Sequence, residues 1–172
     1  MKKLLMFLVA TATALALQAN PEGYIMVSMI SPGQLPTAES NIYGGRLSVI
    51  YGDCQSLYGL DLGISGRIHE RMNGAQFGLL FSLDDAEMNG FGLGCVNYVA
   101  GEFTGCQVGL WNHAEGGAGA QLGVVNTSTT FSGVQLGLLN FAKTFNGVQI
   151  GLSNYAGAQG VCKWLPLVNV GW

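Results

Sequence analysis

The sequence predicts an all-β protein built from tandem single-strand repeats, and three observations support this prediction. A glycine-led unit recurs every 14 to 16 residues, side chains alternate with a period of two within each unit, and helical periodicity is absent after residue 19. Only 10 % of the 172 residues are charged, against about a quarter in a soluble domain, and the mean hydropathy is +0.34. We therefore expect a single β-repeat domain over residues 20–172.

Residues 1–19 are typical of a signal peptide. Lys2 and Lys3 precede a 14-residue apolar run, residues 4–17, and small residues at positions 14 and 16 provide a cleavage site. The run is shorter than the roughly 20 residues that a helix needs to cross a bilayer. The chain is therefore expected to be exported. Cleavage would leave five basic and ten acidic residues, and this negative charge disfavours a nucleic-acid partner.

The strands are expected to follow in chain order. Residues 24–30 and 46–51 form the first two, and seven copies of the repeat start at residues 59, 74, 90, 105, 119, 133 and 147. The clearest copies are GVQLGLLN at residues 133–140 and GVQIGLSN at residues 147–154. Residues 161–172 form a closing strand, and its Val168, Val170 and Trp172 resemble the terminal strand signal of outer-membrane barrels.

The predicted architecture is an antiparallel up-and-down meander, closed into a β-barrel of eight to ten strands. Alternation over residues 134–142 spans about 30 Å at about 3.3 Å per residue, and residues 143–147 are too few to return that far. They suffice for a hairpin turn. A parallel β-solenoid is the alternative. It explains why every strand has the same repeat, but it requires a bend within the strand at Gly137.

The repeat units and their flanks carry a family resemblance. LYGLDLG at residues 57–63, the tandem Gly-x-Gln-x-Gly-Leu-x-Asn units and LPLVN at residues 165–169 resemble a family of bacterial surface-repeat proteins. The resemblance covers residues 43–172. It implies a location in the cell envelope and no established activity.

The repeat places side-chain amides in two rows. The glutamines are Gln76, Gln107, Gln121, Gln135 and Gln149, and the asparagines are Asn97, Asn112, Asn126, Asn140, Asn154 and Asn169. We interpret the glutamines as a row that sets strand register, with the lining of a polar interior as the alternative. The asparagines are expected to satisfy backbone groups at strand ends. Presentation of both rows to a partner is the binding alternative.

Four cysteines, Cys54, Cys95, Cys106 and Cys162, are candidates for disulfides in a chain expected to be exported. Cys95 and Cys106 become neighbours in an antiparallel hairpin, whereas a parallel stack separates them by about 13 Å, which is too far to bridge. Barrel closure would bring Cys54 and Cys162 together. The other interpretation is that all four are small buried apolar residues.

Residues that could perform catalysis are sparse. His69 and His113 lie about three repeats apart without another ligand at metal spacing, so no metal site is predicted. Residues 84–87, DDAE, are interpreted as a solvated acidic turn rather than a calcium loop. No nucleophile elbow, phosphate-binding loop or zinc-protease motif occurs, so neither enzyme activity nor a cofactor is expected.

Together these features predict a protein of the cell envelope. The leading prediction is a small outer-membrane β-barrel with a structural, adhesive or minor pore role, in contact with outer-membrane lipid. The alternative is a periplasmic, secreted or surface-exposed β-solenoid that acts as an interaction module. The sequence identifies no protein partner.

Overall fold

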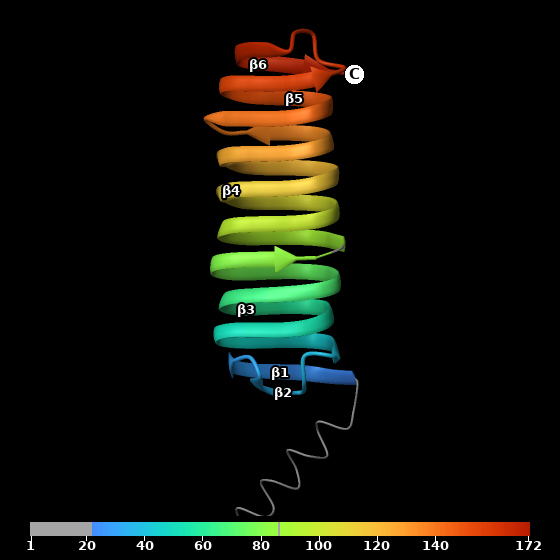
Figure 1. Cartoon of the computed structure of the whole chain (residues 1–172), viewed down its shortest axis with the longest axis vertical. Coiled ribbons are helices and arrows are strands. Elements are labelled where there is room, and N and C mark those ends of the chain that lie inside the picture. Colours follow the sequence, from blue (N-terminus) through green and yellow to red (C-terminus); the bar gives the residue numbers. More distant parts are fainter. Residues whose placement is uncertain (1–21, 86) are drawn as a thin grey trace, which may run out of the picture.

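The computed structural model describes residues 22–85 and 87–172, which form a β-solenoid (Figure 1). The predicted signal peptide lies outside the described residues. The strands are β1 (Glu22–Ile30), β2 (Gly33–Leu35), β3 (Asn41–Asp84), β4 (Glu87–Leu136), β5 (Leu139–Ala158) and β6 (Trp164–Gly171). The all-β prediction is confirmed. Among these residues no helix is long and apolar enough to cross a membrane.

Each coil of the solenoid pairs with the next in parallel register. Asn126 in β4 pairs with Asn140 in β5, and Gly133 pairs with Gly147. β1 with β3 and β3 with β4 are also parallel, while β2 and β6 add one antiparallel strand at each end. The prediction of a closed antiparallel barrel is therefore wrong. The parallel solenoid, which was the alternative, is the fold.

A bend after Gly137 explains why the barrel prediction fails. The consecutive residues Leu138 and Leu139 are 51 % and 49 % exposed, so the in-and-out alternation changes phase between them. β4 ends at Leu136 and β5 begins at Leu139. The apparent nine-residue strand is thus two shorter segments that meet at a corner. The chain can therefore return to its starting edge within one repeat, and no hairpin is needed.

The glycine that opens each repeat forms a further corner. Gly147 has a φ of +138°, a conformation that L side chains rarely adopt. A Cβ at this position would overlap the carbonyl oxygen of Gly133 in the preceding coil. The backbone conformation and the close coil spacing therefore both require glycine at the start of the repeat.

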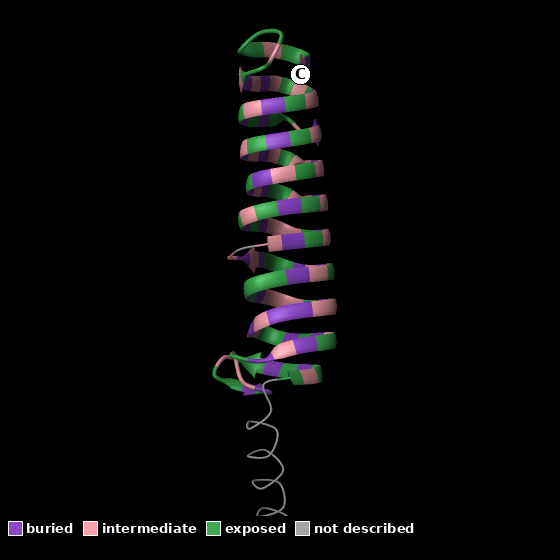
Figure 2. Ribbon diagram, turned by 90° about the vertical axis from the view of Figure 1, so that its right-hand side faces the viewer, coloured by how far each residue is buried: buried purple, intermediate pink, exposed green. Residues whose placement is uncertain are grey.

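Buried positions recur at similar places in successive coils (Figure 2), and their side chains form columns in the interior. One column lies two residues before the repeat glycine and consists of Ile42, Leu57, Met72, Met88, Phe103, Phe131 and Phe145, all buried. Gly117 takes this place in one coil. The rings of Phe103 and Phe131 stack across it, with their centroids 6.5 Å apart. The apolar core is therefore continuous along the solenoid.

Antiparallel strands cover both ends of the solenoid. β2 pairs with β1 and lies between Pro32 and Pro36, whereas β6 pairs with β5 and contains Pro166. Proline lacks an N–H to donate, so these edge strands are poor templates for a further strand. The two caps therefore disfavour end-to-end growth of the solenoid.

The residues predicted to form a barrel signal belong to the C-terminal cap. Val168 pairs with Ile150 and Val170 pairs with Val148, both in antiparallel register. Trp172 follows β6 and is 74 % exposed. These residues therefore cap the C-terminal end of the solenoid and do not form the closing strand of a barrel.

Candidate binding site

The glutamine row lies inside the solenoid and forms a hydrogen-bonded ladder. Gln121, Gln135 and Gln149 each donate through Nε2 to the Oε1 of the glutamine one coil earlier, at 2.7 or 2.8 Å. Gln107 begins this ladder, and all four side chains are fully buried. The row therefore holds the coils in register and offers no contact to a partner.

The asparagine row forms a second internal ladder. Asn97, Asn112, Asn126 and Asn140 each donate to the Oδ1 of the asparagine in the next coil at 2.7 to 2.9 Å, and also to a backbone carbonyl of that coil. Asn154 ends the ladder and donates to the carbonyl oxygen of Leu165 in β6 at 3.1 Å. Because both amide rows are buried, the alternative in which they are presented to a partner is wrong.

A buried ion pair that was not predicted from the sequence continues the glutamine column toward the N-terminus. Arg46 donates to both carboxylate oxygens of Asp61, at 2.8 and 2.6 Å, and Gln76 donates to the same carboxylate at 3.1 Å. Burial alone lowers the pKa of Arg46, but the hydrogen bond and charge of Asp61 raise it above its ordinary value. Position in the repeat is the sequence feature that marks this pair. Asp61 is two residues after Gly59, and Arg46 is two residues after Gly44, on which Gly59 stacks and which therefore opens an eighth coil.

Asp84 is buried, so the prediction of a solvated acidic turn is wrong for this residue. Burial raises the pKa of Asp84 well above its usual range, and neither carboxyl oxygen has a hydrogen-bond partner in the described chain. Asp85 and Glu87 instead pair with Arg67 and Arg71 at 3.0 and 2.9 Å on the exterior. The segment therefore divides between the core and a pair of surface salt bridges.

The two histidines lie on different coils and do not converge on a site. His69 lies between two carboxylates, with Nε2 2.6 Å from Asp53 and Nδ1 2.8 Å from Asp85. His113 Nδ1 lies 2.9 Å from the hydroxyl of Thr127, and burial lowers the pKa of its imidazole. No group of three or more His, Cys, Asp or Glu within the described ranges is arranged to hold a metal ion.

The four cysteines are free thiols in the structure. Cys106 follows Gly105, which stacks on Gly90, whereas Cys95 lies five residues beyond Gly90. This offset of four residues corresponds to about 13 Å along the strand direction, beyond the reach of a disulfide. Of the other two, Cys54 is buried, and burial raises its pKa to about 11, while Cys162 is exposed.

One outer side of the solenoid is wholly apolar, and we call it the apolar face. It comprises the first, third and fifth residues after the glycines at positions 44, 59, 74, 90, 105, 119, 133 and 147. None of these positions holds a polar or charged residue, and Leu79, Leu110 and Leu152 are 60 to 67 % exposed. Ile25 and Val27 extend the face into β1, where they pair with Gly45 and Leu47.

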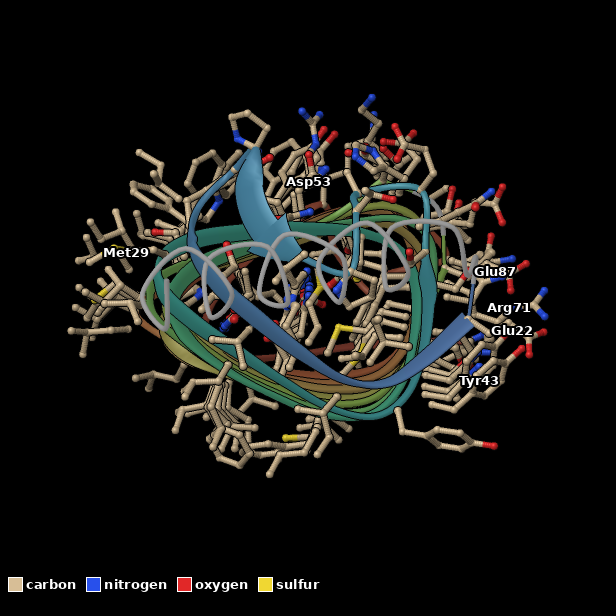
Figure 3. All side chains as sticks on the ribbon, turned by 90° about the horizontal axis from the view of Figure 1, so that it is seen from below. Glu22, Met29, Tyr43, Asp53, Arg71 and Glu87 are labelled. Atoms are coloured by element: carbon tan, nitrogen blue, oxygen red, sulfur yellow. The ribbon has the colours of Figure 1, made fainter. Side chains whose placement is uncertain are left out.

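Charged side chains lie on the other sides of the solenoid. Figure 3 looks along the solenoid and shows carbon-rich side chains along its lower left side, away from Asp53, Arg71 and Glu87. The solenoid is therefore amphipathic around its circumference. This arrangement differs from that of a typical globule, because amide ladders share the core with the apolar column while many leucine, valine and isoleucine side chains face outward.

An open groove of about 490 Å³ crosses the apolar face. Its lining consists of Gly63, Phe77, Gly78, Leu79, Leu93, Gly94, Cys95, Val108, Gly109 and Leu110. The glycines form its floor because they are the inward fourth residues of successive repeats, and the third and fifth residues form its walls. The groove can therefore receive an apolar ridge from a partner.

Comparisons with protein-family models, curated proteins and solved structures give no match for this chain. The resemblance to bacterial surface-repeat proteins therefore stays a prediction. The fold and surface define an amphipathic β-solenoid, and the apolar face is its candidate binding site on geometric grounds.

Proposed function

We propose that this chain is an exported interaction module of the cell envelope that binds an apolar partner through its apolar face. The observation that carries the proposal is the absence of polar side chains from three outward positions in each of eight coils. Large exposed apolar patches are rare on soluble monomers and mark interaction sites. We propose a binding role for this surface and no catalytic one.

Folding of a single chain does not account for the apolar face. Parallel backbone pairing, the two amide ladders and the column of inward apolar residues hold the coils together without it. Complete burial of a leucine side chain stabilises by about 1.5–3 kcal/mol, and much of this contribution is unrealised at Leu79, Leu110 and Leu152. A partner that covers the face would realise it.

Export is part of the proposal and is supported by the lysines and the apolar run of residues 1–19. Cell fractionation combined with the mass of the mature chain tests it. We expect an envelope or extracellular location and a mass that lacks the signal segment. A cytoplasmic chain of full mass would contradict export.

Thiol labelling in cells tests the binding role, because Cys95 and Cys106 lie on the apolar face and Cys162 is exposed elsewhere. We expect a hydrophilic maleimide to label Cys162 and to spare the two face thiols. Leu110→Glu places a charge on the face, next to Cys95 and in the same row as Cys106, and should restore their labelling. Thr130→Glu adds the same charge at an exposed position outside the face and should not. Equal labelling of the face thiols in the native chain and in Leu110→Glu would overturn the binding role.

A further inference from the structure

We infer that the partner is a second copy of this chain, bound through the same face in a twofold face-to-face dimer. The inference rests on the proposed function, since it names the occupant of the apolar face. The area, the charge distribution and the shape of the face each support it.

The area of the face matches one half of a stable interface. The face extends over ten stacked rows, from Ile25 in β1 to Val170 in β6, which is about 43 Å at about 4.8 Å per row. A width of five residues adds about 16 Å, which gives about 700 Å². Two such faces would bury about 1,400 Å², within the range of roughly 1,200–2,000 Å² that specific interfaces bury.

The distribution of charge favours a second copy over a lipid surface. Residues 22–172 contain five basic and ten acidic residues. Arg46 is buried in an ion pair, and Arg67 and Arg71 are paired with carboxylates, so Lys143 and Lys163 are the remaining basic residues. Anionic headgroups attract clusters of Lys and Arg, which this surface lacks. Face-to-face packing, in contrast, joins two uncharged surfaces and keeps the acidic sides of both copies apart.

The face is one side of a parallel sheet, and its side chains can pack against those of a second sheet. Packed sheets lie about 10 Å apart and interdigitate their side chains. The groove between the ridges that contain Leu93 and Leu110 is a recess for a ridge of the partner's face. Because β2 and β6 cap the two ends, a second copy adds to the side of the solenoid. A twofold pair of identical faces then closes the assembly at two copies.

Two native cysteines lie in the middle rows of the face, at its fifth and first positions, and their crosslinking would reveal this geometry. Cys95 and Cys106 belong to the fifth and sixth of the ten rows. A centred twofold axis therefore brings thiols of the two copies within one row, about 4.8 Å along the solenoid. In antiparallel solenoids Cys95 lies near Cys95 of the partner subunit, and in parallel solenoids it lies near Cys106 of the partner subunit.

Sedimentation equilibrium of the full chain without detergent tests the dimer. We expect twice the mass of the single chain. Leu110→Glu removes two leucines from the interface and buries two charges, so we expect the dissociation constant to rise at least about a hundredfold. Thr130→Glu, the matched charge outside the face, should leave the mass unchanged. Circular dichroism of both variants reports whether the solenoid is folded.

Crosslinking decides the question even if Leu110→Glu does not fold. A short apolar bismaleimide, which can enter an apolar interface that excludes the hydrophilic maleimide, should give a covalent dimer in the Cys162→Ser chain, in which the remaining thiol outside the face, Cys54, is buried. The crosslinked pair, read by mass spectrometry of a digest, gives the relative direction of the two solenoids.

A native chain that is monomeric and does not crosslink overturns the inference. If its face thiols are still protected in cells, the proposed function stands with another occupant, and flotation with phosphatidylcholine vesicles would identify that occupant as a bilayer. If the thiols are labelled, the proposed function fails as well. A dimer that survives Leu110→Glu with unchanged affinity also overturns the inference, because its interface must lie elsewhere.

Discussion

Removal of one amide from the asparagine ladder should destabilise the solenoid strongly. Asn126 is fully buried and donates to Asn140 Oδ1 at 2.8 Å and to the Leu136 carbonyl at 2.9 Å, and it accepts from Asn112 Nδ2 at 2.9 Å. Each bond contributes about 1 kcal/mol net, and partners left buried and unpaired cost about 1–3 kcal/mol more. We therefore expect Asn126→Ala to lower the free energy of unfolding by about 4 kcal/mol.

Guanidinium unfolding followed by circular dichroism measures this loss. Asn146→Ala is the matched control, because Asn146 is exposed one coil further on, and we expect it to change stability by less than about 0.5 kcal/mol. Because each coil contacts only the coils on either side of it, Asn126→Ala should increase amide hydrogen exchange mainly in the coil that contains residue 126 and in the two adjacent coils. A loss below about 1 kcal/mol, or equal losses in both variants, would refute the ladder as a source of stability.

Three further predictions concern the buried charges and the repeat glycine. Burial raises the pKa of Asp84, so the folded chain retains a proton that the unfolded chain releases above about pH 4. The free energy of unfolding should therefore fall as the pH rises above about 4. Urea midpoints measured against pH should show this fall in the native chain and not in Asp84→Asn. Arg46→Gln leaves the Asp61 carboxylate buried without its partner and should lower the free energy of unfolding by about 3–5 kcal/mol. Adding Asp61→Gln extends the glutamine ladder and should recover most of this loss, as measured by chemical denaturation. A double variant no more stable than Arg46→Gln would contradict this prediction. Gly147→Ala should cost about 1–3 kcal/mol because its Cβ overlaps the Gly133 carbonyl, and an unchanged unfolding midpoint would argue against the strained corner.

The strands and their spacing could be predicted from the sequence, but the way in which they pair could not. Alternation of residue type does not reveal a corner when Gly137 fills an inward position without a side chain and both Leu138 and Leu139 point outward. The same apolar doublet occurs one coil earlier as Val124 and Val125. Such a doublet marks the point at which the inward-outward alternation shifts by one residue. This shift distinguishes a bent coil from a straight strand.

The interior site residues were harder to predict because their burial depends on the fold. A glutamine or asparagine alone favours the surface, yet identical amides in successive coils satisfy one another and tolerate burial. Asp84 is buried for a different reason. Its coil has 16 residues, and a register shift between Gly78 and Phe81 places Asp84 beside Val99 in an inward column. A shift of one residue reverses every following side chain, and only the register reveals it.

The ladders also explain why the outer surface of this fold is informative about function. Inward side chains bond to and pack against the coils above and below. Folding therefore places few requirements on the outward side chains, and these can differ from one side of the solenoid to another. Here the first, third and fifth outward positions are apolar in every coil, while charged residues such as Arg71 and Glu87 occupy other sides. A lipid-embedded protein would need an apolar surface around its whole circumference. Here apolar residues such as Leu80, Trp111 and Leu139 are also exposed beyond the corner, but charged pairs interrupt the circumference. The side that carries the first, third and fifth positions is flat and wholly apolar, so it fits a flat apolar occupant, and a second sheet of the same kind has that shape.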